Sequence, residues 1–197
     1  NAFIQKIGDQ INEISSRIHR RMLVLCTSYK QTTALRDYLK PKMNQDDRQI
    51  FTQSMGKNRK SLLHGYLQHK RSILIGTSSF WEGVDLPGDK VEILILMKIP
   101  FANPGDPIIQ SQIDHYKMQD RNPFMEFQVP DATVRLKQGF GRLIRTLEDS
   151  GICIIADPRV TRSRYGKVIL DSLPVQAQLY EQSSRIIYEA ESFFGNS

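Results

Sequence analysis

The sequence is poor in the residues that build metal sites, disulfide frameworks and membrane spans. Its two cysteines, Cys26 and Cys153, lie inside apolar runs and lack the spacing of metal ligands. The four histidines are scattered, with no cysteine or acid at ligand spacing, so we expect no metal site. No apolar run approaches the roughly 18 residues of a membrane span, and no signal-peptide pattern opens the chain. We therefore expect packed thiols in a reducing cytosol and no membrane partner.

Several catalytic signatures are also missing. No Gly-x-Ser-x-Gly string or Cys/His pairing indicates acyl transfer, and no pair of carboxylates stands out for acid–base hydrolysis. No Walker A loop is present, because Gly56-Lys57 and Gly166-Lys167 lack the first glycine of that loop and the hydroxyl after the lysine. An Asp-Glu pair of the Walker B type is absent too. By itself, the chain is not expected to hold the β- and γ-phosphates and Mg²⁺ of a nucleotide.

What is present is an ordinary globular composition with a basic balance. The chain has 197 residues, of which 40% are hydrophobic, which is enough for one core and predicts a single domain over residues 1–197. Lysine and arginine together number 27 against 21 acids, and the net charge of +6 favours an anionic partner such as nucleic acid. A weakly basic enzyme would have the same balance. The first residue is Asn and not Met, so we interpret the chain as a fragment of a larger protein.

Amphipathic helices alternate with buried strands along the chain. Helical periodicity predicts a leading helix over 1–20, a C-terminal helix over 176–197, and internal helices over 30–40, 57–69, 108–121, 131–146 and 163–173. Apolar runs predict strands over 22–26, 49–52, 72–76, 91–99 and 152–156. This alternation predicts a three-layer α/β domain around a mostly parallel sheet.

The stretch from Asp131 to Thr146 has an apolar side and a cationic side. We expect its helix to begin after Pro130, with Asp131 as the N-cap. At about 100° per residue, one side holds Leu136, Phe140, Leu143, Ile144 and Leu147, and the other holds Gln138, Gly141, Arg142 and Arg145. Guanidinium groups one turn apart can grip polyphosphate oxygens, and the glycine lets a bulky partner come close. An ordinary solvated helix face has the same pattern.

Small hydroxyls follow two of the predicted strands. Thr27, Ser28 and Tyr29 come after the first strand, and Thr77 and Ser78 come after the third. In parallel α/β sheets, ligands gather at the carboxyl ends of the strands. Hydroxyls and backbone N–H groups at such a junction either hold a phosphate or only cap the next helix.

Two further groups lie near the predicted edge. In the loop after the third strand, Trp81 either stacks on a base or fills the core, and Glu82 and Asp85 either bind a ribose or a metal or pair with the arginines. Asp157 and Arg159 follow the last strand, where they form a helix cap with an exposed arginine or line the same cleft.

Four strings carry a resemblance to one family. QGFGRLIR resembles the last motif, Q-x-x-G-R-x-x-R, of superfamily 2 helicases in its XPD/DinG form. LVLCTSY resembles the fourth motif, FWEGVDLPG closely resembles the fifth motif of DinG-type helicases, and KIPFANPGDPI extends that match. The resemblance covers residues 23–159. It implies the second RecA-like (P-loop NTPase-like) domain of a DinG-type helicase, without a Walker A loop of its own.

The resemblance also implies partners. They are single-stranded DNA, ATP with Mg²⁺ held mainly by a first RecA-like lobe of the same polypeptide, and in some bacterial members a 3′-to-5′ exonuclease domain. The implied setting is the bacterial cytoplasm at the nucleoid. Any Fe–S cluster of the family belongs to the first lobe.

The motif positions imply a role for each residue. Catalysis falls to Arg142 and Arg145 as arginine fingers and to Gln138. Nucleotide contacts fall to Gly141, Glu82, Gly83, Asp85 and Arg159. DNA contacts fall to Thr27, Ser28, Tyr29, Thr77, Ser78 and Trp81.

Two other interpretations remain open. A degenerate helicase would keep only a DNA-binding scaffold for a fused exonuclease, without unwinding. A stand-alone nucleic-acid-binding or protein-docking domain would have no motor partner. On every interpretation, this chain alone is expected to be inactive towards ATP.

Overall fold

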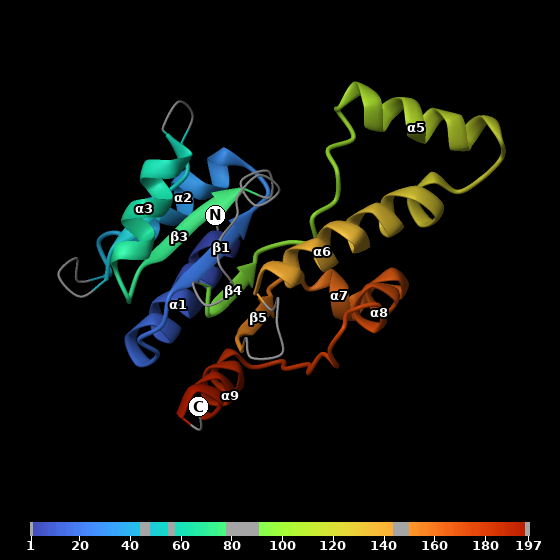
Figure 1. The fold of residues 1–197 in the computed structure, drawn as a ribbon. Helices are drawn as coiled ribbons and strands as arrows, with labels where there is room; N and C mark the ends of the chain where they lie inside the picture. The colour runs from blue at the N-terminus through green and yellow to red at the C-terminus, as the bar shows by residue number, and fades with distance from the viewer. Residues whose placement is uncertain (1, 44–47, 55–57, 78–90, 144–149, 196–197) are drawn as a thin grey trace. The chain divides into compact units, whose positions relative to one another are not determined.

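The computed structural model describes residues 2–43, 48–54, 58–77, 91–143 and 150–195 (Figure 1). They belong to two compact units. The first unit contains Asn1–Lys98, Arg142–Ala156 and Tyr180–Ser197, and the second contains Ile99–Gly141 and Asp157–Leu179.

The first unit is built on a five-stranded sheet in which each strand runs parallel to its neighbours. The strand order is β2-β3-β1-β4-β5. The strands are β1 (Met22–Cys26), β2 (Ile50–Thr52), β3 (Ile73–Thr77), β4 (Ile93–Leu96) and β5 (Ile152–Ile155). The α/β fold with a parallel sheet, predicted from the alternation of helices and strands, is confirmed.

The central strands are apolar, except for Thr77 at the end of β3, because both faces of the sheet are covered. Every residue of β1, β3 and β4 is buried. A half-exposed strand would instead alternate apolar and polar residues. The prediction of a strand over 91–99 was too long, since β4 ends at Leu96, although Met97 N still donates to Leu25 O of β1 (3.0 Å).

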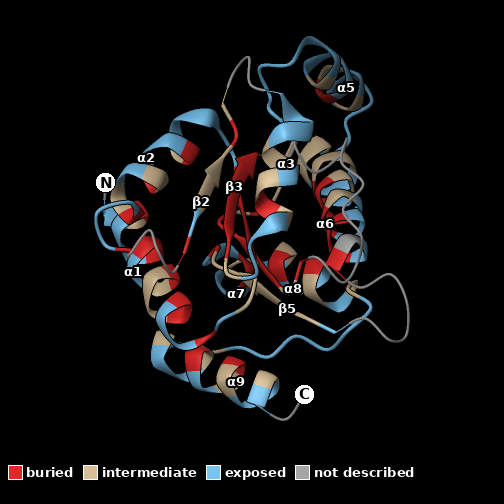
Figure 2. Ribbon diagram, turned by 60° about the vertical axis from the view of Figure 1, so that its left-hand side comes forward, coloured by how far each residue is buried: buried red, intermediate tan, exposed pale blue. Residues whose placement is uncertain are grey.

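Among the described residues of the first unit, four helices accompany the sheet: α1 (Ala2–Arg17), α2 (Tyr29–Leu39), α3 (Arg59–Gln68) and α9 (Ser183–Gly195). Figure 2 shows α1 and α2 on one side of β2 and β3 and α3 on the other side. The sheet and the helices on its two sides are the three layers that the sequence predicted.

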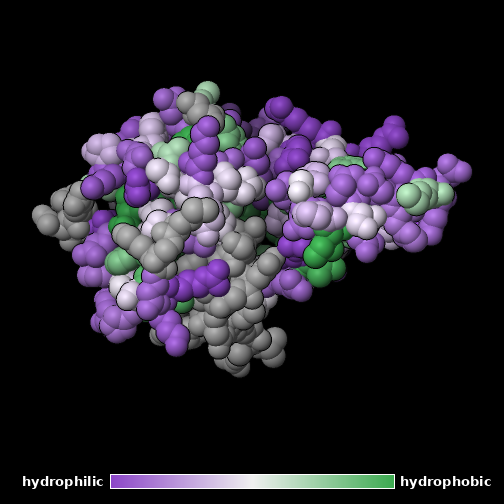
Figure 3. All heavy atoms as spheres, turned by 90° about the horizontal axis from the view of Figure 1, so that it is seen from above, coloured by the Kyte–Doolittle hydropathy of each residue, from purple (hydrophilic) through white to green (hydrophobic). Residues whose placement is uncertain are grey.

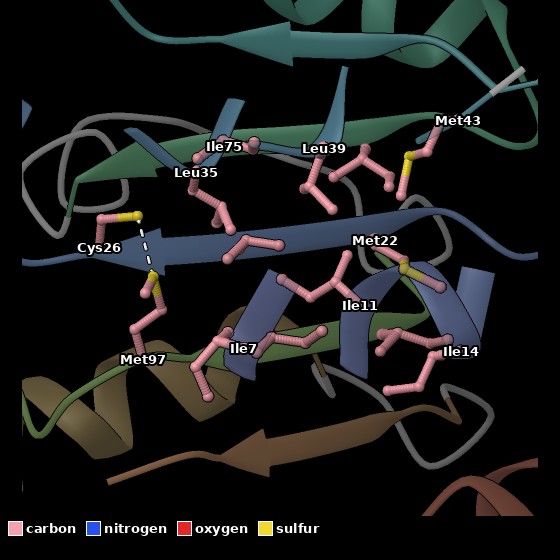
Figure 4. Close-up of a cluster of buried hydrophobic side chains, with 14 of the residues drawn as sticks. Ile7, Ile11, Ile14, Met22, Cys26, Leu35, Leu39, Met43, Ile75 and Met97 are labelled. Carbon is pink, nitrogen blue, oxygen red and sulfur yellow. Dashed lines mark hydrogen bonds between the residues drawn. The ribbon is translucent and has the colours of Figure 1, made fainter. Parts of the chain in front are cut away.

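One side of α1 is a row of isoleucines at helical spacing. Ile7, Ile11 and Ile14 point towards the sheet, where Leu35 and Leu39 of α2 join them (Figure 4). The cluster continues into the side chains of one sheet face: Met22, Val24, Cys26, Ile73, Ile75, Ile93 and Ile95. The alternate strand residues, such as Leu23, Leu74 and Leu94, are buried as well, so the opposite face is also covered.

Both cysteines are free thiols held in apolar surroundings. Cys26 is buried, and its Sγ lies 3.2 Å from Met97 Sδ (Figure 4). Burial raises the pKa of Cys26 and of Cys153 to about 12, so both stay protonated at neutral pH. Cys153 is only half-buried. A thiol that stays protonated is a packing group and not a nucleophile.

The second unit is helical. Its elements are α5 (Pro107–Met118), the π-helix η2 (Phe124–Gln128), α7 (Arg159–Arg162), α8 (Arg164–Asp171) and α6 (Val129–Leu143), whose last two residues belong to the first unit. Phe101, Phe124 and Tyr165 form a mutual aromatic cluster with ring centroids 5.0–5.8 Å apart. This cluster joins three segments of the unit that are distant in sequence.

Some helix boundaries differ from the prediction. Asp131 does not cap α6, which already begins at Val129; its carboxylate pairs instead with Arg135 (2.8 Å). A proline fits the first turn of a helix, where its missing N–H leaves no bond unmade, so Pro130 does not delay the start. The helix predicted over 108–121 ends at Met118, and Asp120 has a left-handed φ of 54°. The C-terminal helix begins only at Ser183, because the chain before it has no buried side to support a helix.

None of the described helices is long and apolar enough to cross a membrane. Hydrophilic residues cover most of the described surface on the face shown in Figure 3. Within the described ranges, no three His, Cys, Asp or Glu side chains come together as metal ligands do.

Ile11 tests the contribution of α1 to the core. It is fully buried, so Ile11→Ala should lower the free energy of unfolding by about 2–5 kcal/mol through lost apolar burial and a residual cavity. Urea unfolding followed by circular dichroism measures this. Lys6→Ala, an exposed change on the same helix, should stay within about 0.5 kcal/mol of wild type. Equal stabilities for the two variants would contradict the packing described.

Candidate functional site

The carboxyl ends of β1 and β3 bring several of the predicted residues together. The two strands are neighbours, with Cys26 opposite Thr77, so Thr27 follows β1 beside the end of β3. The parallel arrangement causes this, since neighbouring parallel strands end at the same edge. Thr27, Ser28, Tyr29 and Thr77 therefore share one edge of the first unit.

Each threonine is held by a glutamine, and the first pair is local. Thr27 donates both its backbone N–H (3.1 Å) and its hydroxyl (3.0 Å) to Gln31 Oε1. Ser28 is the N-cap of α2, and its Oγ accepts from Gln31 N (3.3 Å). The capping interpretation of Ser28 is thus correct for this structure, and it is compatible with a further contact by the exposed hydroxyl.

The second pair crosses from one strand to the next. Thr77 donates its backbone N–H (2.8 Å) and its hydroxyl (3.0 Å) to Gln53 Oε1, just after β2. Gln53 Nε2 in turn donates to the Tyr29 hydroxyl (3.0 Å). Gln53 is 7% exposed, whereas Tyr29 is 36% exposed at the start of α2. The edge therefore has a buried amide that connects β3 to an exposed tyrosine.

Helix α6 presents the second group of predicted residues. Gln138 and Gly141 are exposed, whereas Leu136, Phe140 and Leu143 are buried, as the periodicity predicted. A Cβ built on Gly141 would meet no atom within 4 Å, so open space lies outside this point of the helix. The backbone of Arg142 continues the helix one turn after Gln138.

Asp157 and Arg159 form a close pair in the second unit. Asp157 is 3% exposed, and Arg159 Nη2 lies 2.6 Å from its Oδ2. The same carboxylate accepts from Ile99 N (2.9 Å) and Arg159 N (3.0 Å). The Arg159 guanidinium also lies over the Phe101 ring, 5.3 Å from its centroid.

The charge state of Asp157 reflects two opposing effects. Burial disfavours the carboxylate and would raise its pKa. The hydrogen bonds from the Arg159 side chain, Ile99 N and Arg159 N outweigh burial, so the pKa of Asp157 lies below its ordinary value. The same pairing raises the pKa of Arg159. Arg159 is therefore committed to Asp157 in this structure, and any ligand contact uses its remaining donors.

Several predicted positions lie outside the described residues: Ser78, Trp81, Glu82, Gly83, Asp85 and Arg145. The side chain of Arg142 is not described either. Gln138, Gly141 and Arg159 belong to the second unit, and Arg142 belongs to the first.

Neither glutamine was predicted from the sequence as a site residue. Gln31 stands in the first turn after the Thr-Ser-Tyr string, and Gln53 directly follows the predicted strand over 49–52. Each position held a signal, because a polar side chain just past a parallel strand or in a first helical turn faces the ligand edge. The bonding of each to a threonine could not be inferred, since the pairing of Gln53 with Thr77 depends on strand order.

Chemically, this edge offers neutral hydrogen-bond donors and acceptors, and α6 offers an exposed amide beside an open glycine. Such groups suit an anionic ligand with many oxygen acceptors, which they bind by hydrogen bonds and position without reacting with it.

The model of the helicase C-terminal domain family matches residues 11–176 of this chain. The chain belongs to this family.

The sequence relatives agree with the family. The chain is 37% identical over 171 residues to the ATP-dependent DNA helicase YoaA of Haemophilus influenzae, with 87% of this chain and 26% of the relative covered. It is 32% identical over 173 residues to the 3′-5′ exonuclease DinG of Bacillus subtilis, with 87% and 19% covered. The resemblance to DinG-type helicases is thus confirmed, and the chain spans about a quarter or less of the length of these relatives.

The fold agrees as well. A solved XPD helicase superposes with a TM-score of 0.66 at 18% identity, covering 89% of this chain and 32% of the other. This likeness concerns the fold, and it confirms the RecA-like three-layer architecture of the helicase C-terminal domain.

Asp157 gives a pH-dependent prediction. A carboxylate whose pKa is lowered by folding contributes stability above its unfolded pKa, about 3.9, and loses it as pH falls through the lower folded pKa. Asp157→Asn should therefore cost about 1–3 kcal/mol at neutral pH, and this difference should shrink below about pH 4. Denaturant unfolding of both proteins across pH measures it.

Asp171→Asn is the matched control for this experiment. Asp171 is exposed on α8, so its change should stay within about 0.5 kcal/mol of wild type at each pH. A difference between Asp157→Asn and wild type that grows on acidification would contradict the bonding described.

Proposed function

We propose that this chain is the second motor lobe of an ATP-dependent DNA helicase of the DinG type. The observation that carries the proposal is the exposed face of α6, where Gln138 and Gly141 stand opposite a buried apolar side. Family membership supports it, as do relatives that are named ATP-dependent DNA helicases. The face meets a nucleotide held by another lobe.

On this proposal, α6 provides the residues that act in trans. Arg142 lies one turn beyond Gln138 on α6, and Arg145 comes three residues later in the motif. Both guanidinium groups act on the γ-phosphate of ATP. Such an arginine stabilises charge in phosphoryl transfer and contributes roughly 10³–10⁵ in rate. Gln138 contacts the phosphate or orients water, and the open space at Gly141 admits the neighbouring lobe.

The nucleotide itself is bound mainly by the first lobe of the same polypeptide. The reason is the missing Walker A lysine and Walker B carboxylate in this sequence. ATP with Mg²⁺, when bound there, supplies the free energy for translocation. Glu82, Gly83, Asp85 and Arg159 line the nucleotide from this lobe, and Asp85 with Glu82 couples it to the DNA-facing residues. The isolated chain is accordingly inactive towards ATP.

The edge formed by β1 and β3 holds single-stranded DNA. The sugar–phosphate backbone lies along Thr27, Ser28, Tyr29 and Thr77. Ser78 is a further contact, and Trp81 stacks on a base. Backbone contacts carry little sequence information, so binding hardly depends on base sequence. Binding depends on salt, because the partner is a polyanion. The basic net charge of +6 is in keeping with such a partner.

A second candidate function has one specific observation in its favour. Relatives such as the DinG of Bacillus subtilis are named 3′-5′ exonucleases. In that case this lobe serves as a DNA-binding scaffold for a fused exonuclease domain, and no ATP is turned over. The two functions differ in whether the complete protein hydrolyses ATP.

Arg142→Ala and Arg145→Ala separate these functions in the complete polypeptide. A motor should lose DNA-stimulated ATP hydrolysis by about 10³-fold or more while it keeps ATP binding, because the arginines act on the transition state. Phosphate release and nucleotide binding are measured in parallel. Arg164→Ala, an exposed arginine on α8, should leave both unchanged. A wild-type protein without turnover would exclude the motor and favour the scaffold.

Gly141→Ala should change stability and ATP hydrolysis in opposite directions. Gly141→Ala places a methyl group in open space and replaces a poor helix former, so unfolding should become harder by up to about 1 kcal/mol. If another lobe closes on this face, the same change should nevertheless lower DNA-stimulated ATP hydrolysis. Val134→Ala at another exposed site of α6 is the control. Unchanged turnover in Gly141→Ala would remove this face from the interface.

A further inference from the structure

The two threonines at the β1 and β3 edge have their hydrogen-bond donors turned away from a ligand. A threonine offers a backbone N–H and one hydroxyl proton. In Thr27 both are donated to Gln31 Oε1, and in Thr77 both are donated to Gln53 Oε1. What remains on each hydroxyl is acceptor capacity. Phosphate oxygens only accept, so a threonine in this state gives a phosphate nothing to bind.

The orientation of both glutamine amides follows from the same bonds. A backbone N–H can only donate, so the amide atom that faces Thr27 N or Thr77 N must be the oxygen. The nitrogen of each amide therefore points to the other side. Among the residues that the structure describes, nothing accepts from Gln31 Nε2, which carries two protons at the first turn of α2.

The hydrogen bond from Gln53 Nε2 makes the exposed Tyr29 hydroxyl an acceptor towards Gln53 and leaves it a donor towards other partners. Gln53 Nε2 donates to the Tyr29 hydroxyl at 3.0 Å. A hydroxyl that accepts at its oxygen keeps its own proton free to donate. Tyr29 is 36% exposed, whereas Gln53 is 7% exposed and Thr77 5%. The buried pair thus fixes the direction in which an exposed donor points.

We propose that Gln31 Nε2 and the Tyr29 hydroxyl are the donors that meet the nucleic-acid phosphates at this edge, with Thr27, Thr77 and Gln53 as positioning residues. The proposal rests on the proposed function, because it names the atoms through which this edge holds single-stranded DNA. It replaces direct contacts from two short hydroxyls by contacts from two longer side chains. Both donors contact the phosphates and not the base edges, so they suit any base sequence.

Four variants of the complete polypeptide test this, with a fluorescein-labelled oligothymidylate as the probe in anisotropy titrations at fixed salt. Gln31→Met and Tyr29→Phe should each weaken binding about tenfold, the worth of one hydrogen bond to a charged group. Thr27→Val should weaken binding less than Gln31→Met does. Gln53→Met should weaken binding in the wild-type background and have little further effect on Tyr29→Phe, because both act through one hydroxyl.

If Gln53 only stabilised the fold, Gln53→Met would weaken binding by the same factor in wild type and in the Tyr29→Phe variant. The two changes would then show no coupling. Gln68→Met, an exposed glutamine at the end of α3, is the matched control and should bind like wild type. Tyr29→Phe is conservative and exposed, so it keeps the test valid if a glutamine variant folds poorly.

The outcomes distinguish a failure of this inference from a failure of the proposed function. If Thr27→Val loses most affinity while Gln31→Met binds as well as or better than wild type, the threonines are the direct donors and this inference is overturned, with DNA binding by the edge intact. Unchanged affinity in Tyr29→Phe overturns the role of the tyrosine. If wild type itself does not bind the oligothymidylate, the proposed function falls and the inference falls with it.

Discussion

Burial of a parallel sheet on both faces is the constraint on which the rest of this structure depends. Apolar side chains of β1, β3 and β4 fill both faces, so helices must cover both, and the isoleucines of α1 meet that requirement on one side. Parallel pairing also forces the strands to end at one edge. Polar side chains of neighbouring strands therefore gather at that edge, which is why Thr27 and Tyr29 lie near Thr77 although about fifty residues separate them from it in sequence.

The buried polar groups at that edge are satisfied before any ligand arrives. Gln53 is almost fully buried, and it makes bonds at both ends of its amide, to Thr77 and to Tyr29. A buried amide without partners would be costly, so these bonds fix its orientation. The result is a fixed arrangement of neutral donors, which suits a ligand rich in oxygen acceptors.

The second unit uses one buried carboxylate to join two distant parts of the chain. Asp157 follows β5, and it binds Ile99 N, which lies shortly after β4, as well as the Arg159 guanidinium. Phe101 lies under that guanidinium and contacts Phe124 and Tyr165. The position of Arg159 is therefore determined by packing inside the unit. A role for this arginine at a nucleotide would reuse an orientation that the fold already stabilises.

The sequence alone determined the parallel sheet, the order of strands and helices along the chain, the buried side of α6 and the family. These depend on hydrophobic period and on contiguous motifs. The pairing of Asp131 with Arg135 in place of helix capping, the left-handed residue Asp120 and the late start of α9 could not be predicted from it. Local propensity is overridden by the surface that each segment buries. Only the tertiary structure decided which partner each polar side chain has. Gln53 meets Thr77 because β2 and β3 are neighbours, and no local pattern in the chain encodes that adjacency.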